Sequence, residues 1–163
     1  MTTSTVSASQ NFLSPIRFVF QIDTPELQNI SYNCQSVTIP SITVPEIDVP
    51  FRAFHAKQSG SEIQFDNFEA RFIIDENLEN YTAIYNWMLS EVTTGGQERL
   101  KHKDVILLIY NNNNQSNIRI QMIDAMPVSL SPVEFTTTNS DTQYLVSDVS
   151  FTMDYYKIVS LRS

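Results

Sequence analysis

Few side chains in this sequence are of the types that carry catalytic or metal chemistry. The single cysteine, Cys34, could act as a nucleophile, and His55 and His102 are the only histidines. Neither histidine has a second histidine or a cysteine at the spacing of a metal site, so no metal centre is predicted. Cys34 lies in an alternating strand pattern, where a free cysteine usually behaves as a small buried hydrophobe. We therefore interpret it as structural.

Carboxylates and glycines give no stronger signal of catalysis. Asp75 and Glu76 fit the start of a predicted helix, and Asp23 belongs to a turn. Gly95 and Gly96 lack the Lys-Ser/Thr that follows a phosphate-binding loop, and no Gly-x-Ser-x-Gly elbow is present. A pair of carboxylates that are close only in the folded chain has no signature in the sequence. On its visible motifs, the sequence predicts no enzyme and no cofactor.

Composition indicates one globular domain over residues 1–163. Hydrophobic residues make up 42% and the mean hydropathy is −0.17. No apolar run approaches the ~20 residues that a membrane helix needs, and the polar tail of residues 1–14 does not resemble a secretory signal. The net charge of −8 argues against DNA as a bound ligand, because phosphate binding needs clustered basic residues. The local cluster of Arg99, Lys101 and Lys103 is interpreted as a solvated loop.

The elements expected to position these residues are mostly strands. Apolar patterns predict strands in the ranges 16–22, 31–39, 67–74, 104–110, 117–124 and 144–156. The fourth and fifth of these form a hairpin over 104–124. Range 104–110 is apolar on both faces and is expected to be buried on both. A helix is predicted over 78–93 from apolar residues three and four apart, with Trp87 beside their stripe: Leu78, Tyr81, Ile84, Tyr85, Met88, Leu89 and Val92. The fold class is mainly β, an antiparallel sandwich or barrel with one flanking helix.

An arm over residues 40–60 departs from this regular pattern. Pro40, Pro45 and Pro50 remove backbone donors and favour extended conformations, so the segment cannot be an ordinary central strand. It nevertheless carries many apolar side chains, which need a surface to cover them. We expect that surface to be another copy of the protein, and the candidate contact residues are Ile42, Val44, Ile47, Val49, Phe51 and Phe54.

An ordered set of features makes residues 15–92 resemble the tail tube proteins of contractile-tailed bacteriophages, the family related to the type VI secretion tube protein. The carriers are the strand 18–22, Cys34 through Pro40, the arm with its Val49-Pro50-Phe51-Arg52, Gly60 with 65–68, Asp75-Glu76 and Trp87. Over 104–156 the resemblance is looser and rests on the strand pattern. The N-terminal tail and the residues after Tyr156 depart from the family pattern.

The resemblance implies a structural virion protein whose hexameric rings stack into the inner tube of a phage tail. Each subunit would give about four strands to an inner sheet that closes across subunits. The implied partners are other copies of the chain, the tail sheath protein, the baseplate and the tail terminator, with no membrane. Double-stranded DNA would pass through without specific binding. The implied location is the virion, after assembly in the host cytoplasm.

The polar face of the last strand is a candidate lining for such a tube. If it faces the bore, Asp148 and Asp154 would repel phosphate, and the hydroxyls of Ser150 and Thr152 would keep the wall wet. The alternative is that these four residues simply face solvent on the outside.

Three other functions stay open on the sequence. The chain could be a tube initiator, terminator or baseplate relative that forms a single ring. It could form the tube of a secretion or injection device, or it could be a monomeric β-barrel that binds a small ligand.

Overall fold

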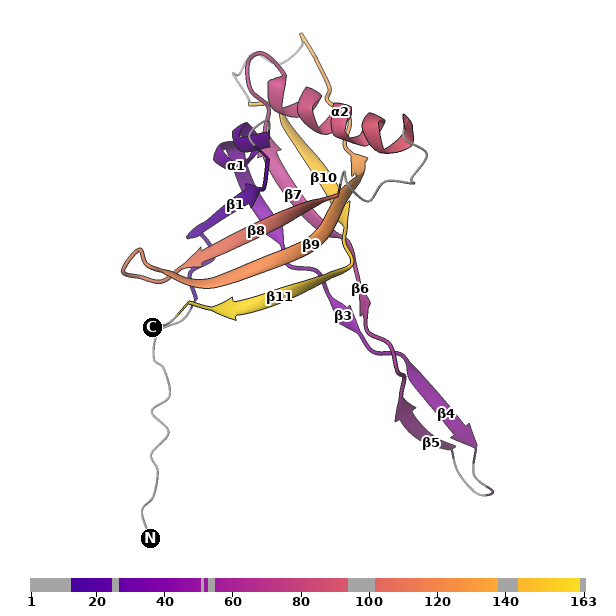
Figure 1. Cartoon of the computed structure of the whole chain (residues 1–163). Helices are drawn as coiled ribbons and strands as arrows, with labels where there is room; N and C mark the ends of the chain where they lie inside the picture. The colour runs from indigo at the N-terminus through magenta and orange to yellow at the C-terminus, as the bar shows by residue number, and fades with distance from the viewer. Residues whose placement is uncertain are drawn as a thin grey trace.

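The computed structural model describes residues 13–24, 27–50, 52, 55–93, 102–137 and 144–161. Strands dominate this part of the chain, and Figure 1 shows how they are arranged. In chain order the elements are β1 (Phe18–Ile22), α1 (Gln28–Asn33), β2 (Cys34–Thr38), β3 (Ile42–Thr43), β4 (Glu46–Pro50), β5 (His55–Ser59), β6 (Gln64–Phe65), β7 (Phe68–Ile73), α2 (Glu79–Thr93), β8 (Lys103–Tyr110), β9 (Ser116–Leu130), β10 (Val146–Thr152) and β11 (Tyr155–Ser160).

The long strand β9 belongs to two antiparallel groups of strands. Its first part pairs with β8 and β11, and β1 pairs with the far edge of β8. Its last part pairs with β10, followed by β7 and β2. We call the first group the β1 sheet and the second the β10 sheet. The mainly β, antiparallel prediction is confirmed, although the strands that the structure describes form no closed barrel within one chain.

A bulge lets β9 turn from one sheet into the other. Asp124 has a positive φ of 52°, and the pairing of β8 with β9 shifts register across it, from Lys103 opposite Ala125 to Val105 opposite Met122. The carboxylate of Asp104 supports this bend, since it accepts the Asp124 N–H at 3.3 Å and the Gln121 amide at 2.9 Å. The neighbouring strand bends at the same level, because β10 ends at Thr152 and β11 starts at Tyr155. Bulges of this kind raise the local twist and redirect a strand.

Phe151 on β10 lies at the centre of the core. Its ring stacks on that of its cross-strand partner Phe68 with centroids 4.8 Å apart. It also lies 5.8 Å from the ring of Trp87 on α2 and 6.5 Å from that of Phe20 on β1. One side chain thus contacts both sheets and the helix, and aromatic pairs add directional attraction to the area they bury.

Helix α2 confirms the predicted range to within one residue, but its buried face is rotated from the predicted stripe. Its fully buried residues are Asn80, Ile84 and Trp87. Tyr85 and Leu89, which were expected to be covered, are about half exposed. Trp87 is therefore central to the buried face and does not flank it.

The start of α2 is held by a reciprocal pair of side chains. Asp75 accepts the Asn80 N–H at 3.2 Å, and Asn80 accepts the Tyr81 N–H at 2.8 Å while donating to the Ile73 carbonyl at 2.8 Å. Asn80 is buried, so these bonds satisfy groups that would otherwise cost stability. Asp75, which the sequence placed at the helix start, thus accepts a backbone N–H of the first turn.

Several predicted boundaries were wrong. The strand over 31–39 begins only at Cys34, because 28–33 form the short helix α1. The last strand breaks after Thr152 and continues through the supposed tail to Ser160. In the strand over 104–110 only one face is buried, and Ile106 and Leu108 are partly exposed. Lys103 was placed in a loop but opens β8, with its Nζ 4.8 Å from the Trp87 ring centroid; Arg99 and Lys101 lie outside the described residues.

Candidate assembly surfaces

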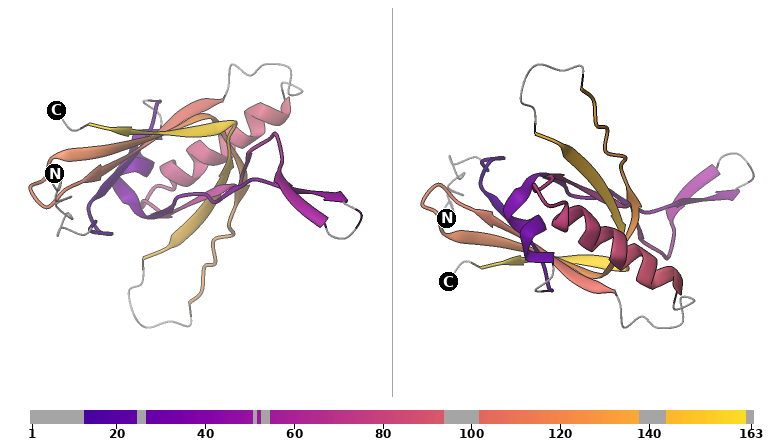
Figure 2. Two further views of the ribbon diagram at one scale, coloured as in Figure 1. Left: turned by 90° about the horizontal axis from the view of Figure 1, so that it is seen from below. Right: turned by 90° about the horizontal axis from the view of Figure 1, so that it is seen from above.

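The arm is a hairpin that projects away from both sheets. Figures 1 and 2 show it extending from the body in every view, and in Figure 1 it points away from the end of the molecule that carries α2. Its stem is the short pairing of β3 with β6, and its outer part is the pairing of β4 with β5. The expectation that this segment lies outside the main sheet is confirmed. A two-stranded hairpin is only marginally stable by itself, so it gains from packing against another surface.

Apolar side chains on the arm are exposed in the single chain. The exposed fraction is 50% for Ile42, 44% for Val44 and 52% for Ile47, while Val49 is half-buried. The candidates Phe51 and Phe54 lie outside the described residues. Exposed apolar groups that gather on one projection are typical of an interaction site. Whether these residues contact another subunit stays a prediction.

The outer face of the β10 sheet is a polar surface built from four strands. Residues directly opposite one another in antiparallel strands share a face, and here the register places Ser36 and Asp148 on either side of Arg71. Ser150 pairs with Glu69 on β7 and with Ser129 on β9. The opposite face carries the aromatic core, so the sheet is apolar toward α2 and polar on its outside.

An ion pair dominates this polar face. The Arg71 Nε donates to one carboxylate oxygen of Asp148 at 2.7 Å, and its Nη2 donates to the other at 2.9 Å. The pairing with Arg71 lowers the pKa of Asp148, and the same contact raises the pKa of Arg71. Both side chains are about half exposed, so the pair lies at the surface. Alternation of apolar and polar residues along 67–74 puts Arg71 on the polar side of its strand, but it does not identify Asp148 as its partner.

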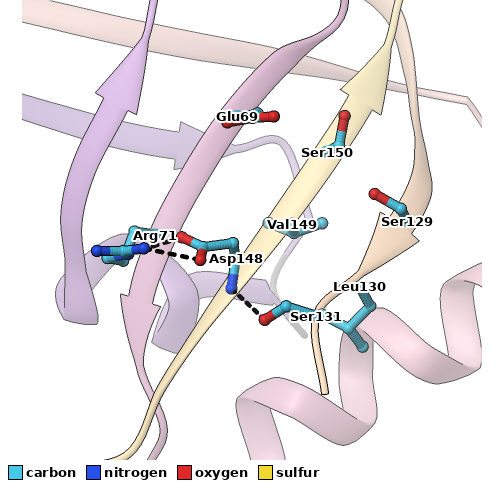
Figure 3. Close-up of a pocket in the computed structure, with 8 residues that line it drawn as sticks. All are labelled: Glu69, Arg71, Ser129, Leu130, Ser131, Asp148, Val149 and Ser150. Carbon is cyan, nitrogen blue, oxygen red and sulfur yellow. Dashed lines mark hydrogen bonds and ion pairs between the residues drawn. The ribbon is translucent and has the colours of Figure 1, made fainter. Parts of the chain in front are cut away.

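A shallow hollow adjoins this pair, as Figure 3 shows. Its walls come from β7, β10 and the end of β9, with Ser129 and Ser131 opposite Glu69 and Arg71. Ser131 fixes the backbone of Asp148: its Oγ accepts the Asp148 N–H at 2.8 Å, and its own N–H donates to the Asp148 carbonyl at 2.8 Å. The carboxylate therefore extends from a backbone whose N–H and carbonyl are both bonded to Ser131.

The other lumen candidates divide into two groups. Ser150 and Thr152 alternate with the buried Val149 and Phe151, so they share the outer face with Asp148 as the sequence pattern indicated. Asp154 lies beyond the end of β10 in the bend before β11, where its N–H donates to the Ile123 carbonyl at 3.1 Å. It is therefore outside the paired part of the β10 sheet.

The described residues give no support for a reactive cysteine or a metal site. Burial raises the pKa of the Cys34 thiol to about 11, although a hydrogen bond from the Ser36 backbone acts the other way. Reactive cysteines instead have lowered pKa values. In the described ranges no group of three histidine, cysteine or acidic residues is placed to hold a metal. None of the helices described here is long and apolar enough to cross a membrane.

Taken together, the fold and its surfaces define a structural assembly module: a sandwich with open sheet edges, a largely polar outer face and a projecting apolar hairpin. Comparison with known proteins agrees with this class. The family model described as phage tail tube protein matches residues 5–159, so the chain belongs to the phage tail tube protein family. Its homologues are structural tube and terminator proteins, which confirms the prediction that it is not an enzyme.

One sequence relative and two solved structures illustrate what the chain is similar to. The chain is 30% identical to the tail tube terminator protein of Enterobacteria phage T4 over 134 residues, covering 77% of this chain and 76% of the relative. Its fold matches that of one chain in the extended sheath-tube complex of the PVC extracellular contractile injection system with a TM-score of 0.71, at 19% identity over 99% of this chain and 100% of that chain. The tube-terminating cap of the anti-feeding prophage matches with a TM-score of 0.69, at 18% identity over 94% of each.

Proposed function

We propose that this chain forms a hexameric ring that ends the inner tube of a phage-type contractile tail. The observation that carries the proposal is the 30% identity to a tail tube terminator over three quarters of both chains. A solved tube-terminating cap also shares the fold. Both relatives support the single-ring alternative that the sequence left open.

The β10 sheet is suited to close such a ring. It is four strands wide, with β2 at one edge and the end of β9 at the other. Pro127 lies in that end of β9, and proline is tolerated in a sheet where its strand is an edge. Joining these edges between subunits would leave no open β edge on the inner wall.

The dimensions of the closed sheet suit a DNA conduit. Six copies would bring together about two dozen strands, and at ~4.8 Å spacing and ~40° tilt these have a backbone circumference of about 150 Å. The corresponding diameter is about 48 Å, and side chains reduce the bore to about 40 Å. Duplex DNA would pass through such a bore without touching the whole wall.

In this ring the outer face of the β10 sheet would line the bore. Its hydroxyl groups from Ser150, Thr152 and Ser129 would keep the wall hydrated, and Glu69 would add negative charge. The net charge of −8 per chain, multiplied around the ring, would oppose adhesion of DNA. The arm would reach a neighbouring subunit and bury Ile42, Val44 and Ile47 there.

A second function, the repeated tube subunit itself, is favoured by one observation. The fold matches a chain of a sheath-tube complex with a TM-score of 0.71 and nearly full coverage. In that case rings would stack into long tubes inside the sheath. If the tube belonged to an extracellular injection device, the chain would have the same role as a tube subunit but DNA would not be the cargo.

Negative-stain electron microscopy of the purified protein tests the proposal. Isolated rings that stay single at high protein concentration are expected for a terminator. Long hollow tubes would overturn the terminator role and favour the tube subunit, and a monodisperse monomer by sedimentation would overturn both. Adding purified ring to growing tubes of the same tail should stop their elongation.

In the complete tail, the partners would be the last tube ring and the neighbouring sheath and terminator proteins, with the baseplate at the far end. DNA would pass through the ring without specific binding. The protein would assemble in the host cytoplasm and remain in the virion.

A further inference from the structure

We propose that Arg71 is a latent phosphate-binding residue and that Asp148 keeps it masked. The pairing itself is a property of the folded chain, and its role in DNA passage rests on the proposed function. Asp148 was predicted to repel DNA by its own charge. The structure assigns it a different task, which is to neutralise a cation on the same face.

Arg71 is the single basic residue in the four paired strand segments of the β10 sheet. Those segments, all described by the structure, are Cys34–Thr38, Phe68–Ile73, Val146–Thr152 and the end of β9 at 126–130. The other charged residues among them are Glu69 and Asp148, both acidic. An unpaired Arg71 would therefore be the one point on this face with a strong attraction for phosphate.

The two hydrogen bonds of the pair have the geometry with which arginine binds a phosphate group, and the Asp148 carboxylate takes the place of the phosphate. Arginine presents two parallel N–H donors that fit either a carboxylate or a phosphate group. Here the two Asp148 oxygens accept from Nε and Nη2 at 2.7 and 2.9 Å. A phosphate oxygen that approached this edge of the guanidinium would have to displace the carboxylate.

Asp148 is well placed to compete with phosphate for Arg71. Its strand register sets it directly opposite Arg71, and Ser131 holds its backbone N–H and carbonyl. A tethered partner at a fixed position acts at a high effective concentration, whereas each phosphate of passing DNA must come from solution. The Asp148 carboxylate is charged at neutral pH, and its hydrogen bond with Arg71 lowers its pKa further.

Stability alone is a weak reason for this pair. Both side chains are about half exposed, and exposed ion pairs typically contribute little to folding. A masking role needs no large stabilisation of the fold. It requires only that Arg71 binds the Asp148 carboxylate in preference to a DNA phosphate. In the assembled ring the masked residue would recur once per subunit around the bore.

The test compares four proteins for binding to a short fluorescein-labelled DNA duplex by fluorescence anisotropy at low salt. They are the wild type, Asp148→Asn, Glu69→Gln and the double variant Asp148→Asn/Arg71→Gln. Glu69→Gln is the matched control, because it removes one negative charge from the same face without releasing Arg71. Circular dichroism and negative-stain images confirm that each variant folds and assembles as the wild type does.

Asp148→Asn is expected to bind the duplex at least tenfold more tightly than Glu69→Gln, with a salt dependence steeper by about one unit per phosphate contacted. The double variant, which loses one acidic and one basic residue and so keeps the net charge of the wild type, should return to the affinity of the wild type. Equal affinity of the two single variants, or a gain that survives the loss of Arg71, would overturn the masking. Asp148→Ser serves as the second unmasking variant if Asp148→Asn folds poorly.

Genome ejection separates this inference from the proposed function. If the face lines the bore, particles that carry Asp148→Asn should eject DNA more slowly, and the double variant should restore the rate. Tighter binding in solution combined with normal ejection would place the face outside the bore and overturn that part of the proposed function, while leaving the masking of Arg71 in place.

Discussion

Gly60 and Pro45 meet at the base of the arm, where the Gly60 N–H donates to the Pro45 carbonyl at 2.6 Å. This contact joins the two sides of the hairpin between its stem, β3 with β6, and its outer part, β4 with β5. A Cβ at position 60 would lie 2.7 Å from that carbonyl oxygen, closer than side-chain carbons approach a backbone oxygen. Only glycine therefore fits without a shift of the backbone.

Replacing Gly60 by valine should displace the arm and leave the body folded. Since the contact involves only the arm, we expect a thermal unfolding midpoint within a few degrees of wild type and a loss of ring assembly in negative-stain images. Ser61→Val, at the exposed neighbouring position, is the control and should assemble normally. Normal rings from Gly60→Val would show that the base of the arm need not be held in this geometry.

Ile47→Asp should produce a stable monomer. Ile47 is 52% exposed, and substitutions at exposed positions usually change the free energy of unfolding by less than about 0.5 kcal/mol. If the arm is buried against a neighbour, the same charge there would be desolvated and block association. Sedimentation velocity would measure the oligomeric state. Ser59→Asp adds an equal charge to the arm without removing an apolar group, and an equal loss of assembly in this control would count against an apolar contact.

Phe151→Ala should destabilise the fold by about 3–5 kcal/mol, the cost typical of deleting a buried aromatic ring. The reason is its position between Phe68, Trp87 and Phe20. Leu89→Ala on the exposed side of α2 should change the free energy of unfolding by less than about 0.5 kcal/mol. Urea denaturation monitored by Trp87 fluorescence measures both. A large effect of Leu89→Ala would support the helix face first expected from the sequence.

Cys34 should react slowly with thiol reagents. With its pKa raised to about 11 by burial, only about 0.1% is thiolate at pH 8, so labelling should be about two orders of magnitude slower than for a free cysteine. Ellman's reagent under native conditions measures the rate, and the urea-unfolded protein is the reference. Rapid native labelling would contradict the structural role of this residue.

Acid should weaken the Arg71–Asp148 pair in a defined direction. The folded pKa of Asp148 lies below its ordinary value of 3.8, so the pair contributes stability above that value and loses it as the pH falls through the lowered pKa. Melting temperatures of wild type and Asp148→Asn should therefore differ most near neutral pH and converge in acid. Because the pair is exposed, the difference should be small. A gap that stays constant down to pH 2 would contradict this linkage.

Local patterns were enough to predict much of the architecture. Alternation along 68–73 and 146–152 predicted strands with the correct faces, and periodicity predicted α2 almost to its ends. The prolines indicated a segment apart from the main sheet, which is the projecting arm. These predictions succeed because strand and helix periods, and the loss of a donor at proline, are properties of neighbouring residues.

Other features could not be read from neighbouring residues. The stripe on α2 was apolar over more of its circumference than the sheet covers, so periodicity alone could not tell that Trp87 is buried and Tyr85 exposed. The bends at Asp124 and after Thr152 depend on each other across two strands. Helix α1 has few apolar residues at helical spacing, and its sequence passes easily for the start of β2.

By itself, the sequence determined the character of the protein: a β-rich chain without catalytic motifs, with an excess of acid and an apolar arm. Only the tertiary structure decided that Arg71 meets Asp148, 77 positions away, and that the two share a polar face four strands wide. The physical reason is that composition and periodicity report only on neighbouring residues. Contacts between distant strands depend on register and bending, which are settled when the whole core packs around Phe151.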